Sequence, residues 1–326
     1  MILVTGGAGF IGSNVAAALA ESGRAVAVCD RLREGEKWRN LRKTRLADVV
    51  TPESLIEWLE AHETVVEAIV HLGAVSSTTE PNVDLIVDVN YRLSRSLWQW
   101  CASRGKRLIY ASSAATYGAG EQGFADGDSI DALNGLRPLN AYGWSKQLFD
   151  CWAVRSAAAG HRPSQWVGLK FFNVYGPNEY HKGAMQSVVA QKYPLAVAGE
   201  AVTLFRSHRP GVADGAQMRD FVYVRDCVDV VLWLLDHRGV NGIYNLGSGH
   251  ARTFEDLVKA LFGALGQPAR IRFVDMPAEI RENYQYFTQA RMERLREAGY
   301  THPFTSLEDG VADYVQRYLA QADRYR

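Results

Sequence analysis

The chain has 326 residues, equal numbers of acidic and basic side chains, and 47% hydrophobic residues, the size of one large domain or two intimately joined ones with a substantial core. Its formal net charge of zero indicates no binding surface for nucleic acid or for an anionic membrane, and no apolar run is long enough to cross a bilayer. The four cysteines are widely spaced and form no Cys-x-x-Cys pair, so we expect buried thiols in a cytoplasmic protein rather than a metal site or disulfides.

A glycine-rich turn lies at the start of the chain, between a short apolar run and a helical pattern. Residues 2–4 predict a buried parallel strand, and the alanine-rich residues 14–20 predict a helix. Glycines at these spacings permit a tight turn, the close approach of a pyrophosphate and close packing of the helix on the strand, while the helix N-terminus offers N–H groups to phosphates. We therefore expect these residues to contact a dinucleotide: Gly6, Gly9, Phe10, Ile11 and Gly12.

An acidic residue follows the second predicted strand, residues 25–29. Asp30 comes about 20 residues after Gly12, where a carboxylate can meet the ribose of an adenosine, and taken alone it favours NAD. Arg31 and Lys37 favour the 2′-phosphate of NADP. Both basic residues are equally consistent with a solvated loop, so these residues leave the choice between NAD and NADP open.

Strands and helices alternate through the first half of the chain. We expect a helix at 49–62, opened by Thr51, a strand at 65–72, a helix at 88–104 and a strand at 107–111. This alternation predicts an α/β fold, a Rossmann-type doubly wound parallel sheet whose ligands bind at the carboxyl ends of the strands. Asn90 could orient groups in that site or be a polar residue of the helix, and the pattern does not decide between them.

Two motifs at those carboxyl ends indicate chemistry. The strand 107–111 leads into Ser112-Ser113, and Tyr142 and Lys146 share one face of a predicted helix because they are four residues apart. A tyrosine hydroxyl has an ordinary pKa of about 10, and a nearby ammonium favours its phenolate form. A serine hydroxyl opposite them could bind the substrate oxygen. Together with the glycine turn, this set predicts hydride transfer between an alcohol and a nicotinamide.

The second half predicts a smaller, mostly C-terminal α/β cap that alternates with the main domain. We assign residues 1–173 and 220–247 to the dinucleotide-binding domain and residues 174–219 and 248–326 to the cap. Arginines 206 and 219 are candidates for a diphosphate, each with a surface ion pair as its alternative. We expect Phe287 in the core. The predicted elements are a strand at 167–173, a turn at 174–177, helices at 184–193 and 226–237, a strand at 242–247, a helix at 254–265 capped by Thr253, and a helix at 307–322.

At this point the chain resembles, nearly end to end, the extended short-chain dehydrogenases/reductases, a family that contains many nucleotide-sugar epimerases and dehydratases. The wider resemblance is carried by residues 110–118, 171–177 and 219–224, and the more specific part by Ser76-Ser77-Thr78-Thr79 and His181-Lys182-Gly183. It implies a tightly held NADP, with NAD as the alternative, a homo-oligomer, and epimerisation at C6 of the heptose in an ADP-heptose of lipopolysaccharide core synthesis.

The resemblance also implies residue roles. Tyr142 and Lys182 would be the two acid/base residues, Ser113 their hydroxyl partner and Lys146 the cofactor-side lysine. Further cofactor contacts would come from Leu72, Gly73, Ala74, Ser76, Asn90 and Val174. The sugar would meet Ser77, Asn173, Ala184, Gln191, Phe205, Arg206, Ser207, His208, Arg219 and Tyr284. Three of these positions depart from the family pattern: Ala184 replaces a serine, Gln191 a histidine and Leu72 a glutamate.

Three alternatives compete with this assignment. A dehydratase of the family needs an acidic pair where this chain has Ala114 and Ala115, which excludes it. A ring 4-epimerase needs only one base, whereas an exocyclic C6 requires a proton donor on each side of a rotating ketone, so Lys182 favours a C6 epimerase. A non-catalytic dinucleotide-binding protein would not need Ser113, Tyr142 and Lys146 together.

Overall fold

A computed structural model describes residues 1–281 and 284–326 and contains a seven-stranded parallel sheet. The strand order is β10-β6-β5-β4-β1-β2-β3, with in-register pairs such as Ile2 opposite Val26 and Ala68. The central strands are buried along their length, as the apolar runs in the sequence predict. The strands are β1 (Ile2–Thr5), β2 (Val26–Cys29), β3 (Asp48–Val50), β4 (Ala68–His71), β5 (Arg107–Ser113), β6 (Gln165–Phe171) and β10 (Gly242–Leu246).

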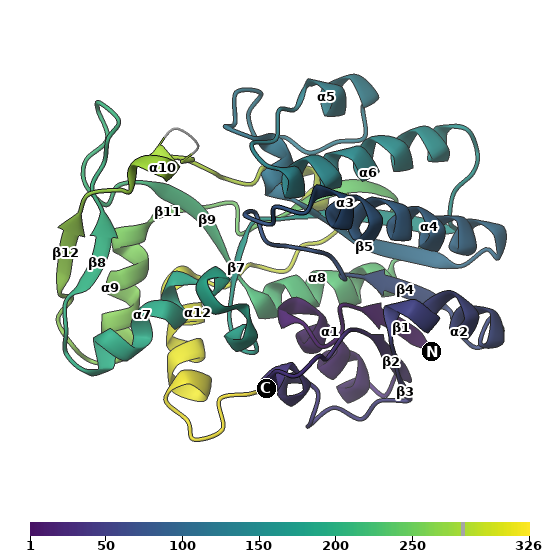
Figure 1. Cartoon of the computed structure of the whole chain (residues 1–326), viewed down its shortest axis with the longest axis horizontal. Helices are drawn as coiled ribbons and strands as arrows, with labels where there is room; N and C mark the ends of the chain where they lie inside the picture. Colours follow the sequence, from purple (N-terminus) through teal and green to yellow (C-terminus); the bar gives the residue numbers. More distant parts are fainter. Residues whose placement is uncertain (282–283) are drawn as a thin grey trace.

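Helices cover both faces of this sheet, which confirms the predicted doubly wound fold (Figure 1). Helices α1 and α8 pack together on one face, and α4 and α6 lie on the other. Trp98 of α4 and Phe149 of α6 are both buried and meet edge to face. The helices of this part are α1 (Phe10–Glu21), α2 (Leu55–Ala61), α3 (Val83–Ile86), α4 (Leu93–Ser103), α5 (Ile130–Gly135), α6 (Ala141–Ala158) and α8 (Val224–Asp236).

Two small sheets and further helices form the rest of the molecule around a second apolar core. One sheet has the order β11-β9-β7, and the other pairs β12 with β8. The elements of this part are β7 (Asn173–Tyr175), α7 (Val188–Val197), β8 (Val202–Phe205), β9 (Met218–Tyr223), β11 (Ala251–Thr253), α9 (Phe254–Ala264), β12 (Ile271–Val274), α10 (Ala278–Arg281) and α12 (Leu307–Tyr314). Helix α11 (Glu293–Glu297) packs instead against β10, and its Leu295 belongs to the core of the large sheet.

Several predicted elements differ from the structure. Residues 48–50 form the edge strand β3 rather than the start of a helix, because they pair with β2. The strand predicted at 167–173 ends at Phe171, and residues 173–175, partly within the predicted turn at 174–177, form β7, which pairs with β9. The helix predicted at 184–193 begins at Val188, capped by Ser187, so Ala184 precedes it. Phe287 is 45% exposed, so the expected core position is wrong; the ring packs edge to face on Phe124.

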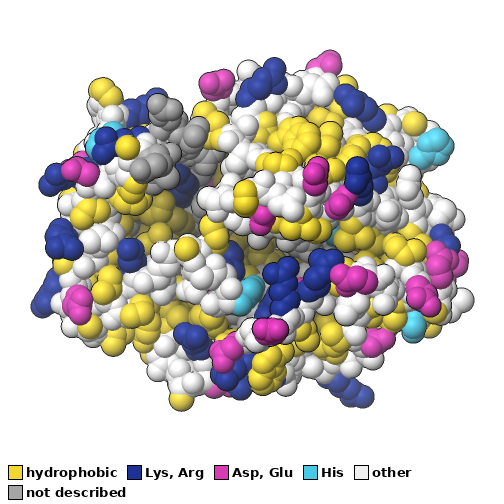
Figure 2. Space-filling model, in the orientation of Figure 1, with side chains coloured by type: hydrophobic (Ala, Val, Ile, Leu, Met, Phe, Trp, Pro, Cys, Tyr) yellow, Lys and Arg dark blue, Asp and Glu magenta, His cyan; other side chains and the backbone are white. Residues whose placement is uncertain are grey.

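Other predictions are confirmed. Thr253 caps α9 in a capping box with Asp256. The four cysteines are buried and unpaired. Within the described ranges no helix is long and apolar enough to span a membrane. On the face shown in Figure 2, basic and acidic side chains are interspersed, as expected for a chain without net charge.

Candidate active site

A cleft of about 320 Å³ lies where strands β1, β4, β5 and β6 end and helix α1 begins. Of the residues assigned to the cofactor, all but Arg31 and Asn90 line this cleft. All four proposed catalytic residues line it too. The complete lining is Gly6, Gly9, Phe10, Ile11, Gly12, Asp30, Lys37, Leu72, Gly73, Ala74, Ser76, Ala111, Ser112, Ser113, Tyr142, Lys146, Phe171, Phe172, Val174, His181, Lys182 and Met185.

The glycine turn has the shape that a dinucleotide requires. A Cβ at Gly12 would lie 2.1 Å from the carbonyl oxygen of Gly6, and one at Gly6, whose φ is +65°, would lie 2.7 Å from Cα of Gly73. Side chains are therefore excluded from this turn. Gly9 supplies no side-chain cap to α1, and the first helical turn carries no acid, so its backbone N–H groups are available to an anion. These residues fit the phosphates of a dinucleotide.

Asp30 lines the cleft, and three contacts hold its carboxylate. Its carboxylate accepts hydrogen bonds from the backbone N–H groups of Ala8 (2.9 Å) and Arg31 (2.7 Å) and pairs with the Lys37 ammonium at 2.5 Å. The Arg31 side chain turns away to an exposed ion pair with Glu53 at 2.7 Å. Lys37, unlike Arg31, therefore remains at the cleft beside the predicted ribose position.

The side chains of Ser113, at the end of β5, and Tyr142, at the start of α6, both line the cleft. Asn140 caps α6 through the Gly143 N–H, which places Tyr142 in the first helical turn. Burial raises the pKa of the Tyr142 hydroxyl, and a hydrogen bond from Ser113 acts in the opposite direction. The phenol is therefore protonated near neutral pH in the free protein. Ser113 also accepts a hydrogen bond from the Ala115 N–H at 3.1 Å, which fixes its side chain at the end of β5.

Lys146 lies one helical turn beyond Tyr142 and is almost fully buried. Its ammonium donates to the carbonyl of Ala111 at 2.8 Å and lies 5.9 Å from the centre of the Tyr142 ring. Burial lowers the pKa of Lys146 to about 8, and the Asp150 carboxylate opposes that shift. The Lys146 ammonium therefore lies near the Tyr142 ring, as the spacing of four residues predicts, and its action on the phenol remains a prediction.

Lys182 reaches the same cleft from a short helical segment, Tyr180–Met185. Its ammonium lies 5.3 Å from the centre of the Phe10 ring, next to the glycine turn. Burial lowers the pKa of Lys182, and the buried carboxylate of Glu179 opposes the shift. A lysine with a lowered pKa can exchange protons more readily near neutrality than a solvated one.

Asn90 and Ser77, predicted to contact the cofactor and the sugar, lie outside the cleft lining. Asn90 is buried and exchanges two hydrogen bonds with the backbone of Val75, at 2.8 and 3.0 Å, and donates to Ser145 at 3.0 Å. It therefore fixes the segment around Ala74 and Ser76, which agrees with a residue that orients the site. The Ser77 hydroxyl bonds to that of Thr79, outside the cleft lining.

The residues predicted to meet the sugar are outside the cleft lining, and several gather on the cap. Buried Arg219 lies against the rings of Tyr284 (5.2 Å) and Phe254, and Tyr284 packs edge to face on Phe205. Arg206 is 53% exposed and lies between Asp214 and Asp275. In the adjacent loop, the backbone N–H of Ser207 bonds to Asp214 and that of His208 to Tyr286. Gln191 bonds to the carbonyl of Ala184, and Asn173 is exposed at the start of β7.

Sequence reasoning missed two polar residues of the cleft. His181 lines it and contacts Asn40 at 3.3 Å, and burial, with the charge of Lys37, lowers the pKa of His181 to about 4. The signal was available, because His181 belongs to the same motif as Lys182. Ser112 also lines the cleft, but its hydroxyl donates to Asp150 at 2.6 Å.

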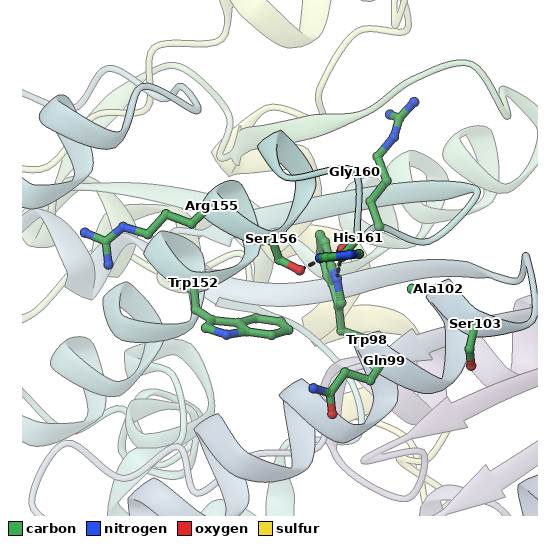
Figure 3. A pocket seen from close by; sticks show the side chains of 10 residues that line it. Trp98, Gln99, Ala102, Ser103, Trp152, Arg155, Ser156, Gly160 and His161 are labelled. Carbon is green, nitrogen blue, oxygen red and sulfur yellow. Dashed lines mark hydrogen bonds between the residues drawn. The ribbon is translucent and has the colours of Figure 1, made fainter.

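A second cavity, of about 610 Å³, lies between α4 and the end of α6 (Figure 3). The indole N–H of Trp98 and the hydroxyl of Ser156 both donate to the carbonyl of His161, at 2.9 and 2.7 Å. Two of the polar side chains drawn there therefore share one backbone carbonyl as their acceptor. Across residues 1–281 and 284–326 no group of His, Cys, Asp and Glu has the arrangement of a metal site.

Comparison with known proteins gives consistent results. The NAD dependent epimerase/dehydratase family matches residues 2–247. Over the full length of both chains the sequence is 49% identical to the ADP-L-glycero-D-manno-heptose-6-epimerase of Nitratidesulfovibrio vulgaris strain DP4. The crystal structure of the enzyme of that name from Helicobacter pylori is similar, with a TM-score of 0.80, 31% identity and coverage of 97% of this chain and 95% of that one. A Thermus thermophilus UDP-glucose 4-epimerase in complex with NAD has a TM-score of 0.73, 27% identity and coverage of 96% and 97%.

Proposed function

We propose that this chain, which belongs to the NAD dependent epimerase/dehydratase family, inverts the configuration at C6 of the heptose in ADP-D-glycero-D-manno-heptose. One observation carries the proposal: Tyr142 and Lys182, from distant segments, line the same cleft beside the glycine turn. The full-length similarity to ADP-L-glycero-D-manno-heptose-6-epimerases supports the substrate. The presence of a second proton-transferring side chain favours a C6 epimerase over a ring 4-epimerase.

Tyr142 and Lys182 transfer the proton in this scheme, and Ser113 and Lys146 assist Tyr142. Tyr142, protonated at rest beside Ser113, gives a proton to the C6 oxygen on one side, and its phenolate accepts one in the reverse direction. The Lys146 ammonium stabilises the phenolate when it forms. Lys182, whose pKa is lowered by burial, does the same on the opposite side after rotation of the exocyclic bond. After one turnover the two residues have exchanged protonation states, because one has accepted a proton and the other has given one, so proton transfer between them or with solvent restores the starting state.

The cofactor would be held by the glycine turn, Asp30 and Lys146. When bound, it would supply a nicotinamide as a reversible hydride acceptor for C6, with no net oxidation of the substrate. We propose NADP rather than NAD, because Lys37 stays at the cleft beside Asp30 and can meet a 2′-phosphate. A cytoplasmic location and a homo-oligomeric state remain predictions.

The test is separation of the two C6 epimers after incubation with ADP-D-glycero-D-manno-heptose. Tyr142→Phe and Lys182→Met should each lower the rate at least about 100-fold, the loss typical of a general acid or base. Lys192→Met, which removes a half-buried lysine from α7, should keep the wild-type rate. In deuterated water the product should carry no deuterium at C6, because the hydrogen leaves and returns as hydride.

One result would overturn the two-base scheme, and a second measurement guards against a false one. Full epimerisation by either the tyrosine or the lysine variant would remove that residue from it. Loss of nicotinamide absorbance from either variant would show a damaged cofactor site instead, so the absorbance of each purified protein is measured first.

A further inference from the structure

A buried ion pair lies directly behind the proposed catalytic residues. Lys170 of β6 donates to Asp150 of α6 at 2.8 Å, and their side chains are 1% and 0% exposed. Neither side chain lines the cleft. Burying two charges costs several kcal/mol of desolvation per ion, and good geometry with additional hydrogen bonds is needed to offset it. Such a pair next to a reaction site therefore calls for an explanation.

The other side-chain hydrogen bonds of this pair lead to β5, which carries Ser113, and to Thr116, which bonds to the Ser113 backbone. Asp150 accepts from Tyr110 (3.1 Å) and Ser112 (2.6 Å) on β5, one residue before Ser113. Lys170 donates to Thr116 at 2.7 Å, and the Thr116 hydroxyl donates to the carbonyl of Ser113 at 2.8 Å. Asp150 itself lies on α6, four residues after Lys146 and eight after Tyr142.

The sheet is shaped to admit this network. Gly168 of β6 lies opposite Tyr110 of β5, and a Cβ there would lie 2.5 Å from the Tyr110 hydroxyl oxygen. The missing side chain therefore leaves the room in which the Tyr110 ring reaches Asp150. On the other side, the Lys170 ammonium lies 5.1 Å from the centre of the Tyr117 ring, and the Tyr117 hydroxyl donates to Asn245 at 2.7 Å.

We propose that Asp150 and Lys170 are positioning residues for the reaction: they hold the Ser113 turn against α6 and fix the charge that surrounds Lys146. This inference rests on the proposed function. The carboxylate favours the protonated form of Lys146, and it also holds the Lys170 ammonium at 2.8 Å. The ammonium that stabilises the Tyr142 phenolate is thus retained to higher pH than burial alone would allow.

The titratable groups around Lys146 and Asp150 come from several elements. The His71 imidazole of β4 is neutral, because burial and the charge of Lys146 lower its pKa to about 3. Burial raises the pKa of the tyrosines and of the cysteine thiol, so these groups are also uncharged near neutral pH. The titratable groups near Lys146 and Asp150 are His71, Tyr110, Tyr117, Tyr142, Cys151 and Lys170.

The experiment compares pH profiles of epimerisation for wild type and Asp150→Asn. The activity of the wild type should fall at alkaline pH as Lys146 loses its proton, which forms the alkaline limb of the pH profile. Asp150→Asn should move this limb to a pH about one unit lower. The double variant Asp150→Asn/Lys170→Met leaves no unpaired buried charge, so it carries the same test if the single variant fails to fold. The alkaline limb of the double variant should also lie at a lower pH than that of the wild type.

Asp226→Asn is the matched control, since Asp226 is a buried carboxylate of α8 that bonds to Thr305, away from the cleft. It should lower stability and leave the alkaline limb in place. A purely structural role for Asp150 would lower activity by one factor at every pH. Unshifted limbs in both Asp150 variants, or an equal shift in Asp226→Asn, would overturn the proposal.

A second readout separates this inference from the proposed function. The dissociation constant of NADPH, followed by its fluorescence at each pH, should show the same displacement in the Asp150 variants, because Lys146 lines the cofactor cleft. If the wild type fails to epimerise ADP-heptose but this displacement is present, the proposed function is wrong and the positioning role stands. An unchanged NADPH profile together with normal epimerisation would refute the positioning role alone.

Discussion

Ser112 and Ser113 are neighbours in the chain with different surroundings. The Ser112 hydroxyl donates to buried Asp150, whereas the Ser113 hydroxyl lines the cleft and lowers the pKa of the neighbouring Tyr142. Successive side chains of a strand point to opposite sides, so a tandem serine at the end of β5 can serve the packing and the cleft at once. The difference between the two residues thus follows from the register of one strand.

Lys37 provides a prediction at the residue scale. Lys37→Met should weaken binding of NADPH about tenfold and leave NADH binding almost unchanged, because only the former carries a 2′-phosphate for the ammonium to meet. Fluorescence titration with both nucleotides measures this. Arg31→Met is the control, as the Arg31 side chain is engaged with Glu53 outside the cleft. Equal losses for NADPH and NADH would refute a phosphate contact at Lys37.

The sequence predicted those cleft residues that lie within one motif. It did not predict contacts between residues from distant segments. The spacing of glycines and the Tyr-x-x-x-Lys pair depend on local geometry, which a sequence displays directly. Asp150 and Lys170 are 20 residues apart, and nothing in either neighbourhood shows that one bonds to the other. Their pairing follows from the register of β5 and β6, which places Ser112 opposite Lys170.

At the scale of elements, long apolar or periodic runs were predicted well and short pairings were missed. Strands β3 and β7 have three residues each, and their existence depends on the partner strands β2 and β9. Residues 87–92 form a π-helical stretch between α3 and α4, so this helical region begins well before residue 88. No local pattern marks such features, because tertiary contacts stabilise them.

The segment that carries Lys182 is attached to the cofactor turn by asparagines. Asn178 is buried, has a φ of +74°, and donates to Ser13 of α1 at 3.0 Å. Asn14 of α1 donates to the carbonyl of Pro177, and Asn40 donates to that of Asn178. These three residues, the asparagine clasp, connect parts of the chain more than 100 residues apart and bring Lys182 to the glycine turn.

The clasp gives a prediction at the element scale. Asn178→Gly tolerates the positive φ but removes the side-chain bonds, so Lys182 should lose its fixed position and kcat should fall about tenfold or more. The KM should change little, and the protein should stay folded. Asn241→Gly, which removes an asparagine near the starts of β6 and β10, should leave kcat unchanged. Wild-type kcat in the Asn178 variant would show that the clasp does not position Lys182.

A buried polar junction lies between the two apolar cores of the molecule. Asp220 of β9 is fully buried and accepts hydrogen bonds from the backbone of Ser248, Gly249 and Ala290, at 2.6, 3.0 and 2.9 Å. Residue 248 follows the last strand of the large sheet. One carboxylate therefore joins the end of that sheet to the segment at 290 and to a strand of the small sheet. The exact domain boundaries remain a prediction.

Buried groups also link the stability of the whole fold to pH. The His71 ring, 3% exposed, bonds to the hydroxyls of Thr5 (2.6 Å) and Ser94 (2.9 Å), which join β4 to β1 and α4. Burial, followed by the charge of Lys146, lowers the pKa of His71 to about 3. The unfolded chain takes up this proton near pH 6.5 and the folded chain does not, so acid favours unfolding.

The sign and size of this effect can be measured. Between pH 6.5 and pH 4, His71 should lower the free energy of unfolding by about 1.4 kcal/mol for each pH unit. The pKa values of Glu179 and Asp220 are raised by burial, so these carboxyls act in the opposite direction, and the comparison must therefore be between variants. In urea unfolding at several pH values, His71→Asn should be less stable than wild type at pH 7 but should lose stability less steeply below pH 6.5. His250→Asn, which alters an exposed histidine, should keep the wild-type slope. Equal slopes for wild type and His71→Asn would show that His71 takes up its proton equally in the folded and the unfolded chain.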